Sequence, residues 1–140
     1  MSNSKFCQCL YFTSNALARK MEKLSSQSWS RVELAPSHAY LLMAVLEEPG
    51  MQPGILADHL QLQPSTITRL IEKLEEKKLV VRTTEGKITN VYPTPKAREL
   101  QPRMNTCMEE FLKNVSELIG KEESLSLVRQ MAKVADKLTD

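Results

Sequence analysis

The chain has 140 residues, a length that suits one domain with a substantial core. Its formal net charge of +2 is too small for a protein that coats nucleic acid without sequence preference. No apolar run is long enough to cross a membrane. The first residues lack the apolar core of a signal peptide, so we expect a soluble, cytoplasmic protein.

The amino-terminal part predicts two helices. Over about residues 4–25, apolar side chains recur at helical spacing, and the serine-rich stretch 25–28 is expected to form the loop that ends this helix. A second helix, rich in leucine and alanine, is predicted from about Ser37 to Glu48, where the following proline and glycine end it. The apolar stripe of the first helix consists of Phe6, Leu10, Leu17, Met21 and Leu24.

A helix-turn-helix pattern follows. Residues 53–60 predict a short helix with Ile55, Leu56 and Leu60 on its core face. After a tight connection, Pro64 begins a longer helix that is expected to reach Lys78, because the fixed φ and missing N–H of proline suit the first helical position. Its core face is marked by apolar residues at i, i+3, i+4 and i+7, which are Ile67, Leu70, Ile71 and Leu74.

The opposite face of this longer helix has the chemistry of a DNA-reading surface. Arginine can bind a guanine edge through two hydrogen bonds, hydroxyl side chains can reach bases or phosphates, and a helix amino terminus favours a phosphate. Such a face is also typical of an ordinary solvated helix, so its context decides between the two interpretations. The candidate base-reading residues are Ser65, Thr66, Thr68, Arg69 and Lys73.

The context is a predicted β-hairpin. Two β-rich runs, residues 79–84 and 87–92, are separated only by Glu85 and Gly86, which predicts a two-residue turn. A hairpin joined directly to a helix-turn-helix indicates a winged helix, which we place at about residues 36–98. The arms carry side chains that suit a basic finger on the DNA backbone or in the minor groove: Arg82, Thr83, Thr84 and Lys87.

The carboxy-terminal part predicts long helices over about residues 100–138, with a joint at Gly120. Their apolar stripes and that of residues 4–25 exceed what a compact winged helix can cover, so we expect the terminal helices to interleave with a second copy in a homodimer. An intramolecular bundle beside the winged helix is the alternative arrangement. The predicted fold is α+β and mostly α-helical, one domain of residues 1–140 in which N- and C-terminal dimerisation helices frame the winged helix.

In this order the elements resemble the MarR family of bacterial winged-helix regulators over almost the whole chain. The family's acidic-x-Arg pattern near the wing tip is absent, and Lys87 is the candidate substitute. The resemblance implies a homodimeric repressor that binds a pseudo-palindromic operator in double-stranded DNA and releases it when a small ligand or an oxidant moves the two winged helices. The matching stretches are residues 35–42, 55–60, 64–75, 79–82 and 91–97.

Cysteine supplies a candidate trigger. The sequence Cys7-Gln8-Cys9-Leu10-Tyr11 resembles the first helix of the family's organic-hydroperoxide-sensing branch, in which a cysteine precedes Leu-Tyr by the same step. The resemblance implies that Cys7 senses the oxidant and that Tyr11, one helical turn on, binds its thiolate. The further tyrosines of that branch have no evident counterpart here. Ordinary small side chains are the alternative interpretation of the cysteines.

No enzyme activity, metal site or cofactor is predicted. The sequence has neither a glycine-rich phosphate loop nor a nucleophile elbow, and His38 and His59 have no evident catalytic partner. Zinc binding would need paired C-x-x-C spacing and a matching histidine, which are missing around Cys7, Cys9 and Cys107.

A winged helix that binds protein without touching DNA is the alternative function class. In such a module the outer face of residues 65–73 should be acidic or apolar, whereas here it carries hydroxyl and basic side chains. Residues 49–103 hold nine Lys or Arg against six Asp or Glu, so the modest basic excess lies where DNA binding is predicted. The sequence therefore favours the DNA-binding interpretation.

Overall fold

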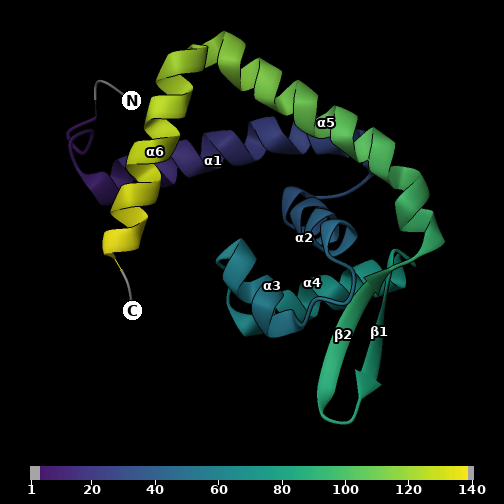
Figure 1. Ribbon diagram of the computed structural model, residues 1–140. Coiled ribbons are helices and arrows are strands. Elements are labelled where there is room, and N and C mark those ends of the chain that lie inside the picture. The colour runs from purple at the N-terminus through teal and green to yellow at the C-terminus, as the bar shows by residue number, and fades with distance from the viewer. Residues whose placement is uncertain (1–3, 139–140) are drawn as a thin grey trace.

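The computed structural model describes residues 4–138; the very start of the chain, where the sequence predicts no signal peptide, lies partly outside this range. Within it, no helix is long and apolar enough to cross a membrane. The fold is α+β and mostly helical, as predicted (Figure 1). Its elements are α1 (Leu10–Trp29), the 3-10 helix η1 (Ser30–Val32), α2 (Pro36–Glu47), α3 (Pro53–Leu60), α4 (Pro64–Glu76), β1 (Val80–Glu85), β2 (Ile88–Pro93), α5 (Pro95–Ile119) and α6 (Lys121–Lys137).

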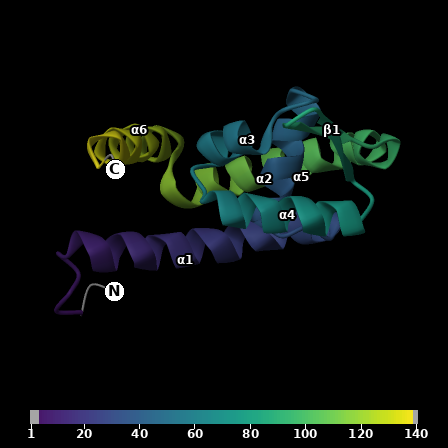
Figure 2. The same cartoon turned by 90° about the horizontal axis from the view of Figure 1, so that it is seen from below.

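The molecule has two parts that meet at α2. Figure 1 shows α3, α4 and the hairpin on one side of α2 and the long helices α1 and α5 on the other. Helix α6 turns back from the end of α5, and in Figure 2 it runs apart from α1. The predicted arrangement of a winged helix framed by terminal helices is therefore confirmed.

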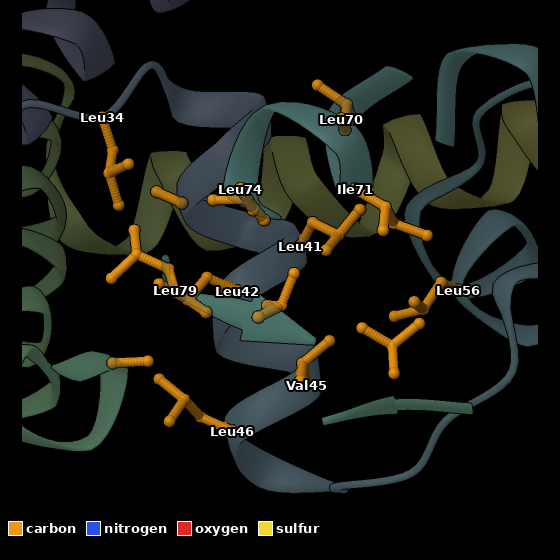
Figure 3. Packing of buried hydrophobic residues seen from close by; sticks show 14 of the residues in the cluster. Leu34, Leu41, Leu42, Val45, Leu46, Leu56, Leu70, Ile71, Leu74 and Leu79 are labelled. Carbon is orange, nitrogen blue, oxygen red and sulfur yellow. The ribbon is translucent and has the colours of Figure 1, made fainter. Parts of the chain in front are cut away.

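The hydrophobic core surrounds α2, which is buried on most of its sides (Figure 3). Leu41, Leu42 and Val45 of α2 are fully buried, and Trp29 joins the same cluster from the end of α1. All four apolar residues predicted for the core face of α4 are buried. In α3 the prediction is only partly right: Leu56 is buried, but Ile55 is 44% exposed, because a step of 100° around the short helix turns it away from α2.

Helix α1 corrects the predicted boundaries of 4–25 at both ends. It begins at Leu10, so Phe6 lies in the turn before it, and it continues through the serine-rich stretch to Trp29. Ser25 and Ser28 are buried in its last turns. Burial of the large Trp29 side chain fixes this end of the helix, and such packing overrides the weak helix propensity of serine.

A Schellman motif ends α4 earlier than predicted. The N–H of Leu79 donates to the carbonyl of Leu74, and the N–H of Lys78 donates to the carbonyl of Glu75, both at 2.9 Å. Lys78 therefore has a left-handed φ of 61° and lies outside the helix, although the predicted helix included it.

The turn between α3 and α4 is closed in the same way. The N–H of Leu62 donates to the carbonyl of Ala57 at 3.1 Å, and Gln61 has a left-handed φ of 53°. Pro64 then starts α4 at its first position, as predicted. The left-handed turn at Gln61 and the proline at the start of α4 thus fix the direction in which α4 leaves the turn.

The hairpin is present, with its turn shifted by one residue from the prediction. Glu85 pairs with Ile88, so the two central residues are Gly86 and Lys87. Gly86 has a φ of 64°, and a glycine at the first central position suits a type II′ turn. The prediction placed Glu85 in the turn because it could not tell which residue beside the glycine paired across the strands.

A short third segment ties the hairpin to the loop before α3. Met51 forms an isolated bridge with Val91, in which the N–H of Val91 donates to the carbonyl of Met51 at 3.0 Å. The N–H of Gly50 donates to the carbonyl of Val91 at 2.8 Å. Val91 is completely buried, so these bonds also satisfy backbone groups that have no access to water.

Helix α5 begins before the predicted residue 100. Thr94 caps it by accepting a hydrogen bond from the N–H of Ala97, and Pro95 occupies its first turn. Pro102 lies inside the helix and does not end it, because Ala97 and Met104 on either side are both completely buried. The predicted joint at Gly120 is confirmed: its φ of 103° ends α5, and α6 begins at the next residue.

We predict that Gly50→Ala destabilises the fold by about 1–3 kcal/mol. Gly50 has a φ of 90°, and an added Cβ would lie 3.1 Å from the hydroxyl oxygen of Tyr92 and 3.2 Å from two of its ring carbons. Gly54→Ala in α3 is the control, since nothing lies within 4 Å of its added Cβ. Urea unfolding should show a lower midpoint only for Gly50→Ala; equal midpoints would contradict this packing.

Candidate nucleic-acid interface

The outer face of α4 presents the predicted base-reading residues on one side of the helix. Ser65, Thr68, Arg69 and Lys73 are exposed, and Thr66 is half-buried at the edge of the core. Figure 1 shows α4 and the hairpin on the side of the molecule away from α1 and α5. The structure therefore brings these five residues together on an open surface.

The amino-terminal end of α4 leaves donors available. Gln63 is the capping residue and makes no side-chain hydrogen bond to the first turn, and that turn contains no acidic residue. The first backbone N–H groups of a helix have no partner within it, and the helix dipole places positive potential there. This end of α4 can bind a phosphate oxygen without any side-chain rearrangement.

Two of the α4 side chains already have partners. The hydroxyl of Thr68 donates to the carbonyl of Pro64 at 3.1 Å, so its oxygen remains as an acceptor. Lys73 lies 3.6 Å from a carboxylate oxygen of Glu76, in an exposed pair that contributes little stability. Arg69 forms no ion pair within residues 4–138, so its guanidinium can take a new acceptor such as a guanine edge.

Charge is unevenly distributed along α4. Arg69 is the charged residue of the first half, whereas the second half contains Glu72, Glu75 and Glu76 beside Lys73. We call the amino-terminal half of α4 its front and the carboxy-terminal half its rear. The front is therefore positive and polar, and the carboxylates lie at the rear. An acidic or apolar front, which the alternative of a protein-binding module requires, is not what the structure presents.

Arg82 on the hairpin has a partner that the sequence did not predict. Its Nη2 lies 2.7 Å from the Oε1 of Glu75 at the rear of α4. The two residues come from different elements, so no local pattern pairs them. Arg82 therefore joins the hairpin to α4, while Thr84 and Lys87 remain exposed farther along the wing, with Lys87 in the turn itself.

His38, at the start of α2, is half-buried near the end of α4. Burial, and to a lesser extent the positive charges of Lys77 and Lys73, lower the pKa of His38 below its ordinary value. The neutral imidazole is thus the form that the folded protein favours. Protonation would add a third positive charge close to two lysines.

We predict that this histidine makes stability depend on pH. The unfolded chain takes up a proton at the ordinary histidine pKa of about 6.5, whereas the folded chain resists it, so stability falls as the pH drops through that value and levels off at the folded pKa. His38→Gln should lose less stability between about pH 7.5 and 5.5 than the native chain, measured by urea unfolding. His59→Gln, which changes an exposed histidine, is the matched control, and equal losses in the native chain and His38→Gln would refute the assignment.

The cysteine hypothesis loses its geometric basis. Cys7 lies in the turn before α1 and not on the helix, and Tyr11 in its first turn is 79% exposed. A four-residue spacing places two side chains on one face only within a helix, so the spacing no longer supports the predicted approach of Tyr11 to Cys7. A sensing role for Cys7 stays a prediction without that support.

The third cysteine lies elsewhere. Cys107 is buried on α5, and burial raises the pKa of its thiol. No group of three potential metal ligands occurs among residues 4–138. The cysteines are therefore divided between the turn before α1 and the middle of α5, and the structure does not gather them into one site.

Comparison with known sequences finds a family model that matches part of the chain. The model, described as the MarR family, matches residues 33–87, from just after η1 to the turn of the hairpin. The matched stretch is less than half of the chain and contains α2, α3, α4 and β1. A curated relative, the uncharacterized HTH-type transcriptional regulator YybA of Bacillus subtilis (strain 168), is 25% identical over 89 residues. The chain spans 59% of that relative's length, with 61% of its own residues aligned.

Solved structures share the fold of this chain over nearly its whole length. The transcriptional repressor CouR bound to p-coumaroyl-CoA has a TM-score of 0.85 at 19% identity, covering 95% of this chain and 96% of that one. CouR bound to a 23-mer DNA duplex has a TM-score of 0.84 at 18% identity, covering 94% and 96%. The similarity extends beyond the winged helix to the terminal helices, which the family model does not cover.

Proposed function

We propose that this chain is a DNA-binding transcriptional regulator of the MarR family, a repressor that binds a pseudo-palindromic operator as a homodimer. The observation that carries the proposal is the acid-free front half of α4, with an unpaired Arg69 and an uncapped amino terminus, beside a hairpin with Lys87 in its turn. CouR, which has the same fold, is a repressor solved on a DNA duplex. The proposal covers one MarR-like domain, with the winged helix at about residues 36–98.

In this proposal α4 enters the major groove with its amino-terminal end first. Arg69 reads a guanine edge, and the acceptor oxygen of Thr68 suits the amino group of an adenine or cytosine. Ser65, Thr66 and the first N–H groups of α4 hold a phosphate, which sets the register. Lys73 contributes a further phosphate contact after it releases Glu76.

The hairpin supplies a second anchor. Lys87 and Thr84 reach the neighbouring backbone or minor groove, where a lysine contributes charge without reading a particular base. Arg82 keeps its bond to Glu75 and acts as a positioning residue, because it fixes the hairpin relative to α4. Arg82 therefore positions the hairpin and does not itself bind DNA, whereas the sequence predicts a direct DNA contact.

The dimer proposal rests on apolar side chains that this chain leaves uncovered. Helix α6 buries none of its residues, and the start of α1 and the second half of α5 are equally open. A second copy that packs on these helices would hold two copies of α4 at a fixed separation. The exposed side chains include Leu10, Tyr11, Leu112, Leu118, Leu125, Val128, Met131 and Val134.

The remaining parts of the proposal follow from DNA as the partner. A regulator of chromosomal DNA works in the cytoplasm and responds to a small-molecule or oxidant effector, as CouR is solved with p-coumaroyl-CoA. It acts by binding and catalyses no reaction, in line with the regulators that it matches. The alternative, a protein-binding winged helix, is disfavoured by the charge on the front of α4.

We expect Arg69→Ala to weaken binding to the preferred operator by about 1–3 kcal/mol and to relax base preference at one position of each half-site. Lys87→Ala should weaken all sequences alike and reduce the salt slope by about one. Lys113→Ala, an exposed change on α5, is the control. Fluorescence anisotropy on an operator recovered by in vitro selection measures all three, and native affinity and selectivity in Arg69→Ala would refute the proposal.

We expect Val128→Asp to weaken or abolish the dimer, because it places a charge in the middle of the apolar stripe of α6. Lys133→Asp, on the polar side of the same helix, should leave the dimer intact. Sedimentation velocity at micromolar concentration should give twice the chain mass for the native protein and for Lys133→Asp. A native monomer, or an unchanged dimer in Val128→Asp, would contradict the arrangement.

A further inference from the structure

The tip of the hairpin exposes an isoleucine. Ile88, the first residue of β2, is 51% exposed, although isoleucine is among the side chains that proteins most often bury completely. Figure 1 shows the hairpin projecting beyond α3 and α4, so its tip is free to approach a DNA duplex that lies against α4. None of the DNA contacts proposed above uses this side chain.

The strand register fixes the direction of Ile88. It pairs with Glu85 across the hairpin, and Val91, three residues farther along β2, is completely buried. Side chains alternate between the two faces of a strand, so Ile88 and Glu85 lie on the face opposite to Val91. Arg82 pairs with Val91 and reaches Glu75 of α4 from that inner face. Ile88 therefore lies on the outer face of the hairpin.

The tip of the hairpin, residues 84–88, has no net charge. Lys87 is offset by Glu85, and neither forms an ion pair within residues 4–138. Gly86 adds no side chain, and nothing lies within 4 Å of the Cβ that another residue would carry there. A slim, neutral tip gains little from the negative potential of a DNA groove, so apolar contact through Ile88 is the interaction that it can add.

We propose that Ile88 contacts the floor of the minor groove and makes the hairpin prefer A·T over G·C base pairs. The inference rests on the proposed function, because α4 must first place the hairpin on DNA. In the minor groove an A·T pair presents only acceptors and the apolar C2–H of adenine, whereas a G·C pair adds the amino group of guanine. Isoleucine is one of the apolar side chains that minor-groove proteins use.

The amino group of guanine explains the preference. It lies where adenine has its C2–H, and it is the donor that distinguishes the two pairs in this groove. An isoleucine side chain packs against a C–H group, but it excludes water from the amino group without accepting its hydrogen bond. A donor left without a partner in this way costs free energy. Ile88 would thus read the minor groove while Arg69 reads the major groove.

The first test uses the native chain and changes only the DNA. Each base pair that flanks the α4 half-site of the selected operator is replaced in turn, and affinity is measured by fluorescence anisotropy. At the pair under the hairpin, G·C should bind about tenfold more weakly than A·T. Inosine·C lacks the amino group but keeps the major-groove edge of G·C, and it should bind within about twofold of A·T. Diaminopurine·T, which carries the amino group, should bind as weakly as G·C.

The second test changes the protein. Ile88→Ala should bind the A·T and G·C operators within about twofold of each other, because the shortened side chain leaves room for water at the amino group. Val81→Ala is the matched control, since Val81 is an exposed apolar residue of the same face at the base of the hairpin. It should keep the native preference. Equal urea midpoints for both variants and the native chain show that the fold is intact.

Native binding that ignores the amino group at every flanking pair would overturn the inference. So would a full preference in Ile88→Ala, or a preference lost equally in Val81→Ala, which would assign it to the hairpin as a whole. Native binding that depends on Arg69 but not on Ile88 overturns this inference alone. Absence of operator binding by the native chain overturns the proposed function and this inference together.

Discussion

Burial of one side of α4 against α2 is the constraint on which the rest of this structure depends. Ile67, Leu70, Ile71 and Leu74 are buried at helical spacing, and each such side chain contributes about 1.5–3 kcal/mol. Exposed ion pairs contribute at most about 1 kcal/mol, so apolar burial decides the rotation of the helix. Because side chains on one helix are fixed relative to one another, the same burial turns Ser65, Thr68, Arg69 and Lys73 outward.

Apolar packing sets the rotation of α4. Backbone hydrogen bonds and one ion pair fix the positions of the α3–α4 turn and the hairpin beside it. The Schellman turn at Gln61 and the proline start at Pro64 orient α4 after α3. The bridge between Met51 and Val91 holds the base of the hairpin, and the bond from Arg82 to Glu75 holds the hairpin to the rear of α4. The proposed major-groove and backbone contacts thus belong to one rigid surface.

Local patterns in the sequence predicted most of the winged helix because each signal is local. The spacing of the apolar residues of α4, the proline at its start and the glycine between two β-rich runs each act within a few positions of the residues they position. Boundaries were less predictable wherever tertiary packing outweighs propensity. Burial of Trp29 keeps α1 helical through residues 25–28, which were predicted to form a loop. Burial on both sides of Pro102 keeps α5 continuous.

The contacts that the sequence did not predict join side chains of different elements. Glu75 of α4 is paired with Arg82 of the hairpin, and Arg31 of η1 is paired with Glu110 of α5. The pairing of Cys7 with Tyr11 loses its support from spacing for a related reason: the two residues are four positions apart, but the helix begins between them. Spacing indicates a shared face only after the element itself is established.

The proposed function requires that two copies of α4, held by the terminal helices, read the same operator. In vitro selection of a random duplex library with the full native chain tests it most directly. We expect an enriched motif of two inverted half-sites whose centres lie about 10–10.5 base pairs apart, or a multiple of that spacing. No enrichment by the folded dimer, or enrichment of a single half-site bound by one chain, would contradict the claim.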